Sequence, residues 1–363
     1  MFYHLFYSLK EIFSGFNVFR YITFRAVGAI ITAFLVSIIF GPYIIKLLKR
    51  FNIGERVRSR EDVPGIYSNH KDKEGTPTMG GLIMLGSILF ATILWARLDN
   101  HYILLTIFAT LWLGTLGFID DYIKLTAKKS SGLSKKTKFL GQITLGLIIG
   151  IILFVDSNVG SSIYFPFFKN LTWNVGILYI FFVTFVIVGT SNAVNLTDGL
   201  DGLAIGCMVM VALAYTIISY VVGNSQLSNY LFINYIPGTG ELAIYCAAIV
   251  GAGLGFLWFN SYPATVFMGD VGSLALGGGI GVVACCIKKE MLLLIVGGIF
   301  VFEAISVILQ VVVFKIRRQR VFLCAPFHHH LEMKGWPESK IVVRFWIVAA
   351  ILALFTLMTL KLR

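Results

Sequence analysis

The sequence predicts an all-α, polytopic integral membrane protein with about ten transmembrane helices. The first observation is composition, because 57% of the residues are hydrophobic and only 13% are charged, whereas a soluble protein carries about 25% charged residues. The second is a series of apolar runs that approach or exceed the roughly 20 residues needed to span a bilayer as a helix. The third is the uneven distribution of Lys and Arg among the loops, which is typical of membrane proteins with a fixed orientation.

We expect one transmembrane domain that covers residues 1–363. The boundary between the eighth and ninth apolar runs rests only on Lys288, Lys289 and Glu290. The ten runs lie at about 21–45, 79–96, 102–119, 139–155, 174–194, 203–222, 241–258, 271–287, 291–314 and 341–360.

The basic residues predict the orientation of the chain. Most of the 30 Lys and Arg residues fall in the loops 46–73, 124–138 and 315–344, which follow the first, third and ninth runs. The richer side of a membrane protein is cytoplasmic, so both termini should lie outside. The net charge of +12 then reflects topology and attraction to anionic lipid or phosphate, and we expect no nucleic-acid partner. The five cysteines lie mostly within apolar runs, so we expect no disulfide or zinc site.

The stretch 191–202 lies between two apolar runs and is rich in oxygen ligands. It holds Asn195, Asp198 and Asp201 together with Gly199 and Leu200, and it contains no Lys or Arg. Carboxylate and amide oxygens suit a hard divalent cation, and glycine lets a ligand approach the backbone. A tight turn between two helices is the alternative, but it accounts less well for two Asp-Gly pairs.

The third run closes with two adjacent carboxylates, Asp120 and Asp121, followed by Lys124. Acids at a helix C-terminus oppose the helix dipole, which favours a function for them over a solvated helix end. Lys138 opens the next run. Most lysines here satisfy the orientation bias, but one or two could hold a diphosphate as point charges.

The segment 258–272 holds Asn260, Phe267 and Asp270 just before the eighth run. Asp270 should lie at a helix N-terminus, where it can cap the helix, bind a metal or do both. Phe267 could stack on a flat base, although a lone aromatic near a membrane interface is commonly a belt residue.

Three consecutive histidines, His328, His329 and His330, lie between the ninth and tenth runs. Side chains of consecutive residues in a helix diverge, so the three cannot ligate one ion together, and no HExxH spacing is present. Protonatable rings near lysines fit phosphate binding, but from the histidines alone an exposed loop is slightly favoured.

All of these groups fall on one side of the predicted membrane. The acids of the third, fifth and seventh loops share that side with the histidines and most lysines. This segregation predicts one polar site at the inner membrane surface, assembled from several helix ends.

Taken together, these motifs resemble those of phospho-N-acetylmuramoyl-pentapeptide transferases, a branch of the polyprenyl-phosphate N-acetylhexosamine-1-phosphate transferases. The resemblance covers essentially the whole chain, and its most specific parts are Thr-Pro-Thr-Met-Gly-Gly at 76–81 and Pro-Phe-His-His-His-Leu-Glu at 326–332. It also includes Phe-Ile-Asp-Asp-Tyr at 118–122, Asn-Leu-Thr-Asp-Gly-Leu-Asp-Gly at 195–202 and Phe-Met-Gly-Asp at 267–270.

The resemblance implies roles for individual residues. Asp270 would ligate Mg²⁺, with Asp198 beside it. The catalytic group would comprise Asp120, Asp121, Asp270, Lys124, Lys138 and His329. The substrate-binding group would comprise Asn195, Asp198, Gly199, Leu200, Asp201, Asn260, Phe267, His328 and His330.

The resemblance also implies a reaction. Undecaprenyl phosphate would attack the β-phosphate of UDP-N-acetylmuramoyl-pentapeptide, giving lipid I and UMP in peptidoglycan synthesis, with Mg²⁺ required. The enzyme would be a multi-pass protein of the bacterial inner membrane, with its site on the cytoplasmic side. Membrane lipid is a further expected partner, and the sequence is compatible with a homodimer.

Two alternatives remain at this point. One is a related transferase that uses UDP-N-acetylglucosamine, against which the histidine motif argues. The other, in a different class, is a secondary transporter, because intramembrane carboxylates are typical of transporters. Transporter sites lie near the midplane and commonly within repeats, whereas these acids gather at one side of the membrane.

Overall fold

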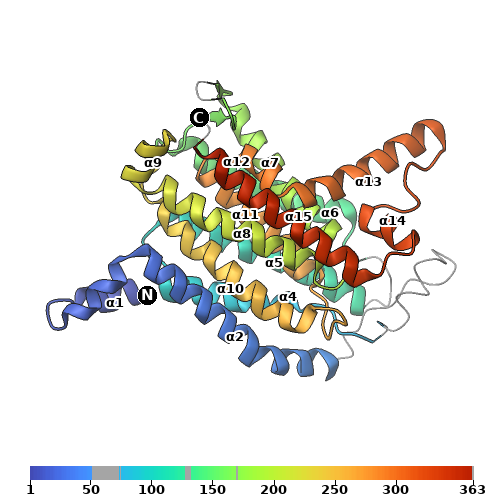
Figure 1. Ribbon diagram of the computed structural model, residues 1–363, viewed down its shortest axis with the longest axis horizontal. Helices are drawn as coiled ribbons and strands as arrows, with labels where there is room; N and C mark the ends of the chain where they lie inside the picture. The colour runs from blue at the N-terminus through green and yellow to red at the C-terminus, as the bar shows by residue number, and fades with distance from the viewer. Residues whose placement is uncertain (51–72, 74, 127–131, 169–170, 362–363) are drawn as a thin grey trace.

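The computed structural model describes residues 1–50, 73, 75–126, 132–168 and 171–361. Basic loop residues such as Arg56, Lys71 and Lys128 lie outside these described residues. Within them the chain is almost entirely helical, with one small β-hairpin (Figure 1). The elements are α1 (Phe2–Ser8), η1 (Ser14–Arg20), α2 (Ile22–Arg50), α4 (Gly81–Trp95), α5 (His101–Thr126), α6 (Lys135–Val155), β1 (Ser162–Tyr164), β2 (Thr172–Asn174), α7 (Leu178–Thr197), α8 (Leu203–Val222), α9 (Ser225–Leu231), η3 (Thr239–Glu241), α10 (Leu242–Asn260), α11 (Gly269–Cys286), α12 (Glu290–Val296), α13 (Gly298–Arg317), α14 (Phe327–Met333) and α15 (Glu338–Thr359).

Within the described residues, nine helices are long and apolar enough to cross a membrane. They are α2, α5, α6, α7, α8, α10 with η3 before it, α11, α13 and α15. The shorter apolar helix α4 accounts for the remaining predicted run. The prediction of an all-α polytopic membrane protein is therefore confirmed.

The centre of the bundle is formed by α10 and α11, which are the most enclosed of these helices. α10 packs against α2 and α8, while α11 packs against α5 and α7. Small residues permit this close packing, since a Cβ at Gly277 of α11 would lie 2.5 Å from the carbonyl oxygen of Thr190 in α7. Close approach through glycine is characteristic of membrane helices.

The structure differs from the predicted spans in three places. The ninth run is not one helix, because Gly297 ends α12 and Gly298 begins α13, and a pair of glycines is a common site for a break. The helix of the third run continues to Thr126, past the two acids that end its apolar part. Between α6 and α7, β1 and β2 pair antiparallel, with Ile163 opposite Trp173.

The helix ends that carry the predicted site residues lie together at one end of the bundle. In Figure 1 the end of α2, the end of α13, α14 and the start of α15 all lie on the right, whereas the N-terminus and α9 lie on the left. The alternation of helices thus brings the loops after α5, α7, α10 and α13 to one end, as the parity of the runs predicted.

Cysteine labelling tests the orientation of the two ends. Cys324 is the native cysteine with some exposure, and the other four are buried, so the background is Cys324→Ser. We expect a membrane-impermeant maleimide to label Ser157→Cys, an exposed position just after α6, in intact cells. Lys334→Cys, exposed at the end of α14, should react only after permeabilisation. The reverse pattern would contradict the orientation predicted from the basic residues.

Candidate active site

Three carboxylates, two of them buried and one partly exposed, form a compact group at this end of the bundle. Asp120 and Asp121 come from α5 and Asp270 comes from the first turn of α11, and one oxygen of each lies within 4.8 Å of the others. The helices can approach because residue 117 is glycine, and a Cβ there would fall on the backbone carbonyl of Asp270. We call these three residues the acidic cluster.

Two lysines neutralise part of the acidic cluster. The Lys124 ammonium lies 2.6 Å from Asp120 Oδ2, 3.3 Å from Asp121 Oδ1 and 2.9 Å from Asp270 Oδ2. Lys138 lies 2.7 Å from the same oxygen of Asp270 and 3.9 Å from Asp120. Ser134 caps α6 by accepting from the Thr137 amide, which places Lys138 in the first turn facing the acids. Buried charges need such partners because desolvation is costly.

Backbone and amide donors fix the remaining oxygens of the acidic cluster. Asn195 donates from Nδ2 to Asp270 Oδ1 at 2.6 Å, and also to Ser273 Oγ at 2.9 Å. Asp121 Oδ2 accepts from the amide of Val271 at 3.2 Å. Asp120 Oδ1 accepts from the amide of Leu133 at 2.8 Å. Each carboxylate is therefore oriented by a second contact besides the lysines.

Asp270 is not the N-cap of its helix, contrary to the alternative raised from the sequence. The cap position of α11 is Met268, without a side-chain cap, and Asp270 lies inside the first turn. The turn begins at Gly269, which has a φ of 72°. A Cβ there would also lie 2.6 Å from Asp121 Oδ2, so only glycine suits this position.

The segment at the start of α4 hydrogen-bonds to the residues that come just before Asp270 in the chain. The Phe267 amide donates to Pro77 O, the Gly80 amide donates to Phe267 O, and the Gly81 amide donates to Met268 O, each at 2.8 Å. The sequence motif at 76–81 leads into α4. In the structure it also forms a short backbone ladder with 267–268.

A second ion-pair cluster lies on the neighbouring loops, and we call it the Lys73 cluster. Lys73 Nζ lies 2.7 Å from Asp201 Oδ1 and 2.7 Å from Glu338 Oε1. Its ammonium also lies 5.9 Å from the centre of the Phe267 ring. Sequence reasoning gave no role to Lys73 or Glu338, because neither lies in a motif whose spacing points to the site.

The charge of Lys73 is secured by its partners. Burial of the ammonium opposes its charge, but the carboxylates of Glu338 and Asp201 outweigh this effect and raise the pKa of Lys73 above its ordinary value of 10.5. A raised pKa means that this group stabilises the fold fully below about pH 10.5 and loses that contribution only as pH rises through the higher value. Lys73 is therefore a permanent cation under working conditions.

Asn260 joins the loop that follows Asp201 to the segment that leads to Phe267. Its Oδ1 accepts from the amide of Gly202 at 3.1 Å, and its Nδ2 donates to Val266 O at 2.9 Å. Asp201 Oδ2 accepts from the amide of Ala264 at 2.9 Å. The predicted loops 191–202 and 259–270 are thus joined by hydrogen bonds directly beside Phe267.

The three histidines lie on α14. The His328 and His329 rings do not diverge, since their centroids are 4.2 Å apart, but each of the three rings has a different polar partner. His328 Nδ1 lies 3.3 Å from Glu303 Oε2. His329 Nδ1 lies 2.6 Å from Glu332 Oε2, and His330 Nδ1 accepts from the amide of Leu323 at 3.1 Å. Burial and the ammonium of Lys334 lower the pKa of His330 below 6.5. These rings do not form one metal site.

The preference for an exposed histidine loop was wrong, since His328 is fully buried in a short helix. Its ring packs against Gly199, where a Cβ would collide with Nε2. Glu303 reaches it from the ninth run, and this contact could not be found from spacing because 25 residues separate the pair. The histidine segment therefore packs against the loop at 198–202 through the contact between His328 and Gly199.

The roles predicted for Asp198 and Leu200 remain predictions. Asp198 is the C-cap of α7, directly after its last residue Thr197, and it is not a member of the acidic cluster found among the described residues. Leu200 is buried in the same loop. The acidic cluster groups Asp270 with Asp120 and Asp121, while Asp198 remains a predicted metal ligand.

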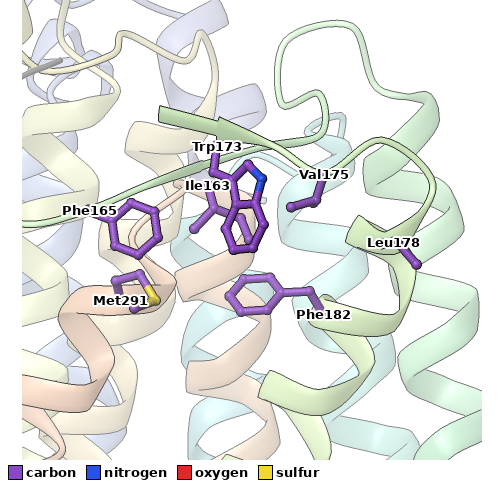
Figure 2. A pocket seen from close by; sticks show the side chains of 7 residues that line it. All are labelled: Ile163, Phe165, Trp173, Val175, Leu178, Phe182 and Met291. Atoms are coloured by element: carbon purple, nitrogen blue, oxygen red, sulfur yellow. The ribbon is translucent and has the colours of Figure 1, made fainter. Parts of the chain in front are cut away.

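An apolar pocket lies far from these charges. Figure 2 shows Trp173, Phe165, Phe182 and Met291 around it, with Ile163, Val175 and Leu178 completing the lining. Leu178 is the first residue of α7 and Asn195 lies in its last turn, so the two are about 26 Å apart along the helix. The pocket therefore has no part in the acidic cluster.

Comparison with known proteins agrees with this arrangement. Residues 102–288 match the family model described as Glycosyl transferase family 4, and residues 73–85 match signature 1 of phospho-N-acetylmuramoyl-pentapeptide-transferase. These matches include the acidic cluster, Lys73 and the segment that hydrogen-bonds to Phe267.

Curated relatives match over their full length. A phospho-N-acetylmuramoyl-pentapeptide-transferase of Desulfotalea psychrophila is 54% identical over 364 residues, with 100% of both chains covered. Proteins of the same name from Geobacter sp. and Desulforapulum autotrophicum are 52% and 50% identical, again with 100% of both chains covered. The resemblance inferred from the motifs is confirmed, and the chain belongs to the phospho-N-acetylmuramoyl-pentapeptide-transferase family.

Proposed function

We propose that this protein transfers phospho-N-acetylmuramoyl-pentapeptide from UDP-N-acetylmuramoyl-pentapeptide to undecaprenyl phosphate, producing lipid I and UMP for peptidoglycan synthesis. The observation that supports it most directly is the acidic cluster with its two lysines at one end of a membrane bundle. Phosphoryl transfer depends mainly on positioning and on neutralising charge. A site at a membrane surface can receive a soluble nucleotide and a lipid phosphate, each from its own phase.

The charge balance of the site supports Mg²⁺ as the cofactor. Three carboxylates face two lysines, and the carboxylates already gather around one cation, the Lys124 ammonium. Such a donor set fits a hard divalent ion. We assign Asp270 of the acidic cluster as one residue that would hold it, and the resemblance adds Asp198 from the end of α7 as a second. When bound, the ion would supply neutralising charge to the diphosphate of the donor.

The remaining residues divide into two groups in this proposal. Lys124, Lys138 and His329 would neutralise phosphate oxygens, with His328 and His330 among the substrate-binding residues. Around the nucleotide, Phe267 would stack on uracil, bordered by Asn195, Asp198, Gly199, Leu200, Asp201 and Asn260. The hydrogen bonds that join Gly202 to Asn260, Asn260 to Val266 and Ala264 to Asp201, next to Phe267 in the chain, support this grouping.

We assign Asp120, with Asp121 beside it, to the acceptor. Asp120 lies where the apolar part of its helix ends, level with an arriving lipid headgroup. A phosphate monoester has a second pKa of about 6 and is largely a dianion near neutral pH, so positioning the lipid phosphate should matter more than deprotonating it. The lipid phosphate would then displace UMP directly, without a covalent enzyme intermediate.

The location follows from the same proposal. The chain would form a single domain in the inner membrane, with both termini outside and the site on the cytoplasmic side. The lysine-rich loops on the side of the site support this orientation. Membrane lipid surrounds the bundle in this proposal, and a homodimer is compatible with it.

The first test is turnover by purified protein in detergent, where no ion gradient exists. We expect UMP release from UDP-N-acetylmuramoyl-pentapeptide when undecaprenyl phosphate and Mg²⁺ are both present. UDP-N-acetylglucosamine is the control donor and should give little product. Preference for the control donor would contradict the proposed substrate, and UMP release that does not require the lipid would contradict the proposed acceptor.

Asp270→Asn tests the metal assignment. It removes one charge while preserving shape, so we expect turnover to fall by about 10²-fold or more, since losses of this size follow removal of electrostatic stabilisation. In a Mg²⁺ titration, the variant should need a higher Mg²⁺ concentration to reach half of its maximal activity. Asp99→Asn, an acid paired with Arg97 outside the site, is the matched control and should retain activity. Unchanged activity and metal dependence of Asp270→Asn would refute the assignment.

Phe267→Ala tests the position of the nucleotide. Stacking of a base on an aromatic ring contributes about 1–3 kcal/mol, so we expect the donor KM to rise roughly tenfold, while the KM for the lipid stays constant. Phe267→Tyr keeps the ring face and should stay near wild type. A donor KM that does not change in Phe267→Ala would rule out the stacking contact.

A further inference from the structure

The Lys73 cluster joins four parts of the chain that are distant in sequence. Lys73 precedes α4, Asp201 lies between α7 and α8, Ala264 follows α10, and Glu338 is in the first turn of α15. The three charged side chains are largely enclosed, with 13%, 2% and 9% of Lys73, Asp201 and Glu338 exposed. Ion pairs in such surroundings are screened less by water and salt than pairs on an open surface.

Glu338 makes two contacts with one oxygen. Its Oε1 lies 2.7 Å from Lys73 Nζ and also accepts from the backbone amide of Asp201 at 2.7 Å. Asp201 uses its own two oxygens differently, since Oδ1 pairs with Lys73 and Oδ2 accepts from the Ala264 amide. Glu338 thus holds both the ammonium and the backbone of the loop that carries Asp201.

These contacts set where the Lys73 charge lies relative to Phe267. The ammonium is 5.9 Å from the centre of the ring, and two carboxylates from separate segments of the chain, Asp201 and Glu338, restrain it there. With only Asp201 left, the flexible lysine side chain would keep one ionic partner and regain rotational freedom. Holding a charge in advance reduces what must be ordered when a ligand binds.

We infer that Glu338 is a positioning residue for the donor substrate, and that it holds Lys73 and the loop at Asp201 in the arrangement that receives a nucleoside diphosphate beside Phe267. This inference rests on the proposed function for the identity of the donor. Glu338 acts through Lys73 and Asp201, so its effect should be on donor binding and should leave the acidic cluster intact.

Glu338→Gln is the central variant. Its amide oxygen can still accept from the Asp201 amide, but the charge that pairs with Lys73 is gone. We expect the donor KM to rise roughly five- to tenfold, equivalent to about 1–1.4 kcal/mol, because Lys73 loses one of its two ionic partners. The kcat and the lipid KM should stay within about twofold of wild type. Ser339→Ala, the exposed next residue of α15, is the matched control and should behave as wild type.

A double-mutant cycle with Lys73→Met separates positioning from a structural role. If Glu338 acts through Lys73, adding Glu338→Gln to Lys73→Met should change the donor KM by less than about twofold. An acid in a first helical turn also stabilises its helix. A purely structural role would lower kcat and thermal stability alike, and would do so equally in the Lys73→Met background. That result, or an unchanged donor KM in Glu338→Gln, would overturn the inference.

Direct binding distinguishes failure of this inference from failure of the proposed function. UDP is titrated into wild type, Glu338→Gln and Ser339→Ala by calorimetry. Weaker UDP binding only in Glu338→Gln supports the inference even if the wild type fails to turn over the muramoyl donor, in which case the proposed reaction is wrong. Equal UDP affinity in all three proteins, or no UDP binding by the wild type, overturns the inference whatever the turnover.

Discussion

Three carboxylates meet one ammonium where α5 packs against α11, and this contact constrains much of the surrounding structure. Asp120, Asp121 and Asp270 would repel one another at these distances if Lys124 and Lys138 did not lie between them. Burial strengthens both the repulsion and the attraction, because little water remains to screen them. The close approach of α5 and α11 at Gly117 and the cap at Ser134 place the carboxylates next to the two lysines, which offset part of their charge.

The sequence predicted the helices and the gathering of the acids because both follow from simple regularities. Span length is fixed by bilayer thickness, and the alternation of spans decides which loops share a side. Parity alone therefore brought Asp120, Asp201 and Asp270 to one end.

Features that depend on distant partners could not be predicted in this way. Glu303, Lys73 and Glu338 each reach their partners across 25 to 265 residues, and no local spacing encodes such a meeting. The break at Gly297 and the uncapped start of α11 are local, but tertiary packing decides whether a glycine breaks a helix or an acid caps one. Roles of single residues, such as Asp198 at the metal, still rest on resemblance.

The backbone ladder between 77–81 and 267–268 gives part of the segment matched by the family signature a structural role. These hydrogen bonds use amides and carbonyls, not side chains, so the segment can position Phe267 and Asp270 without touching any ligand. A substitution that displaces this backbone would also displace residues 267–268, which lead into α11. A substitution in this segment could therefore weaken an inhibitor at the site by moving Phe267 and Asp270, and a map of resistance drawn only from ligand-contacting residues would miss it.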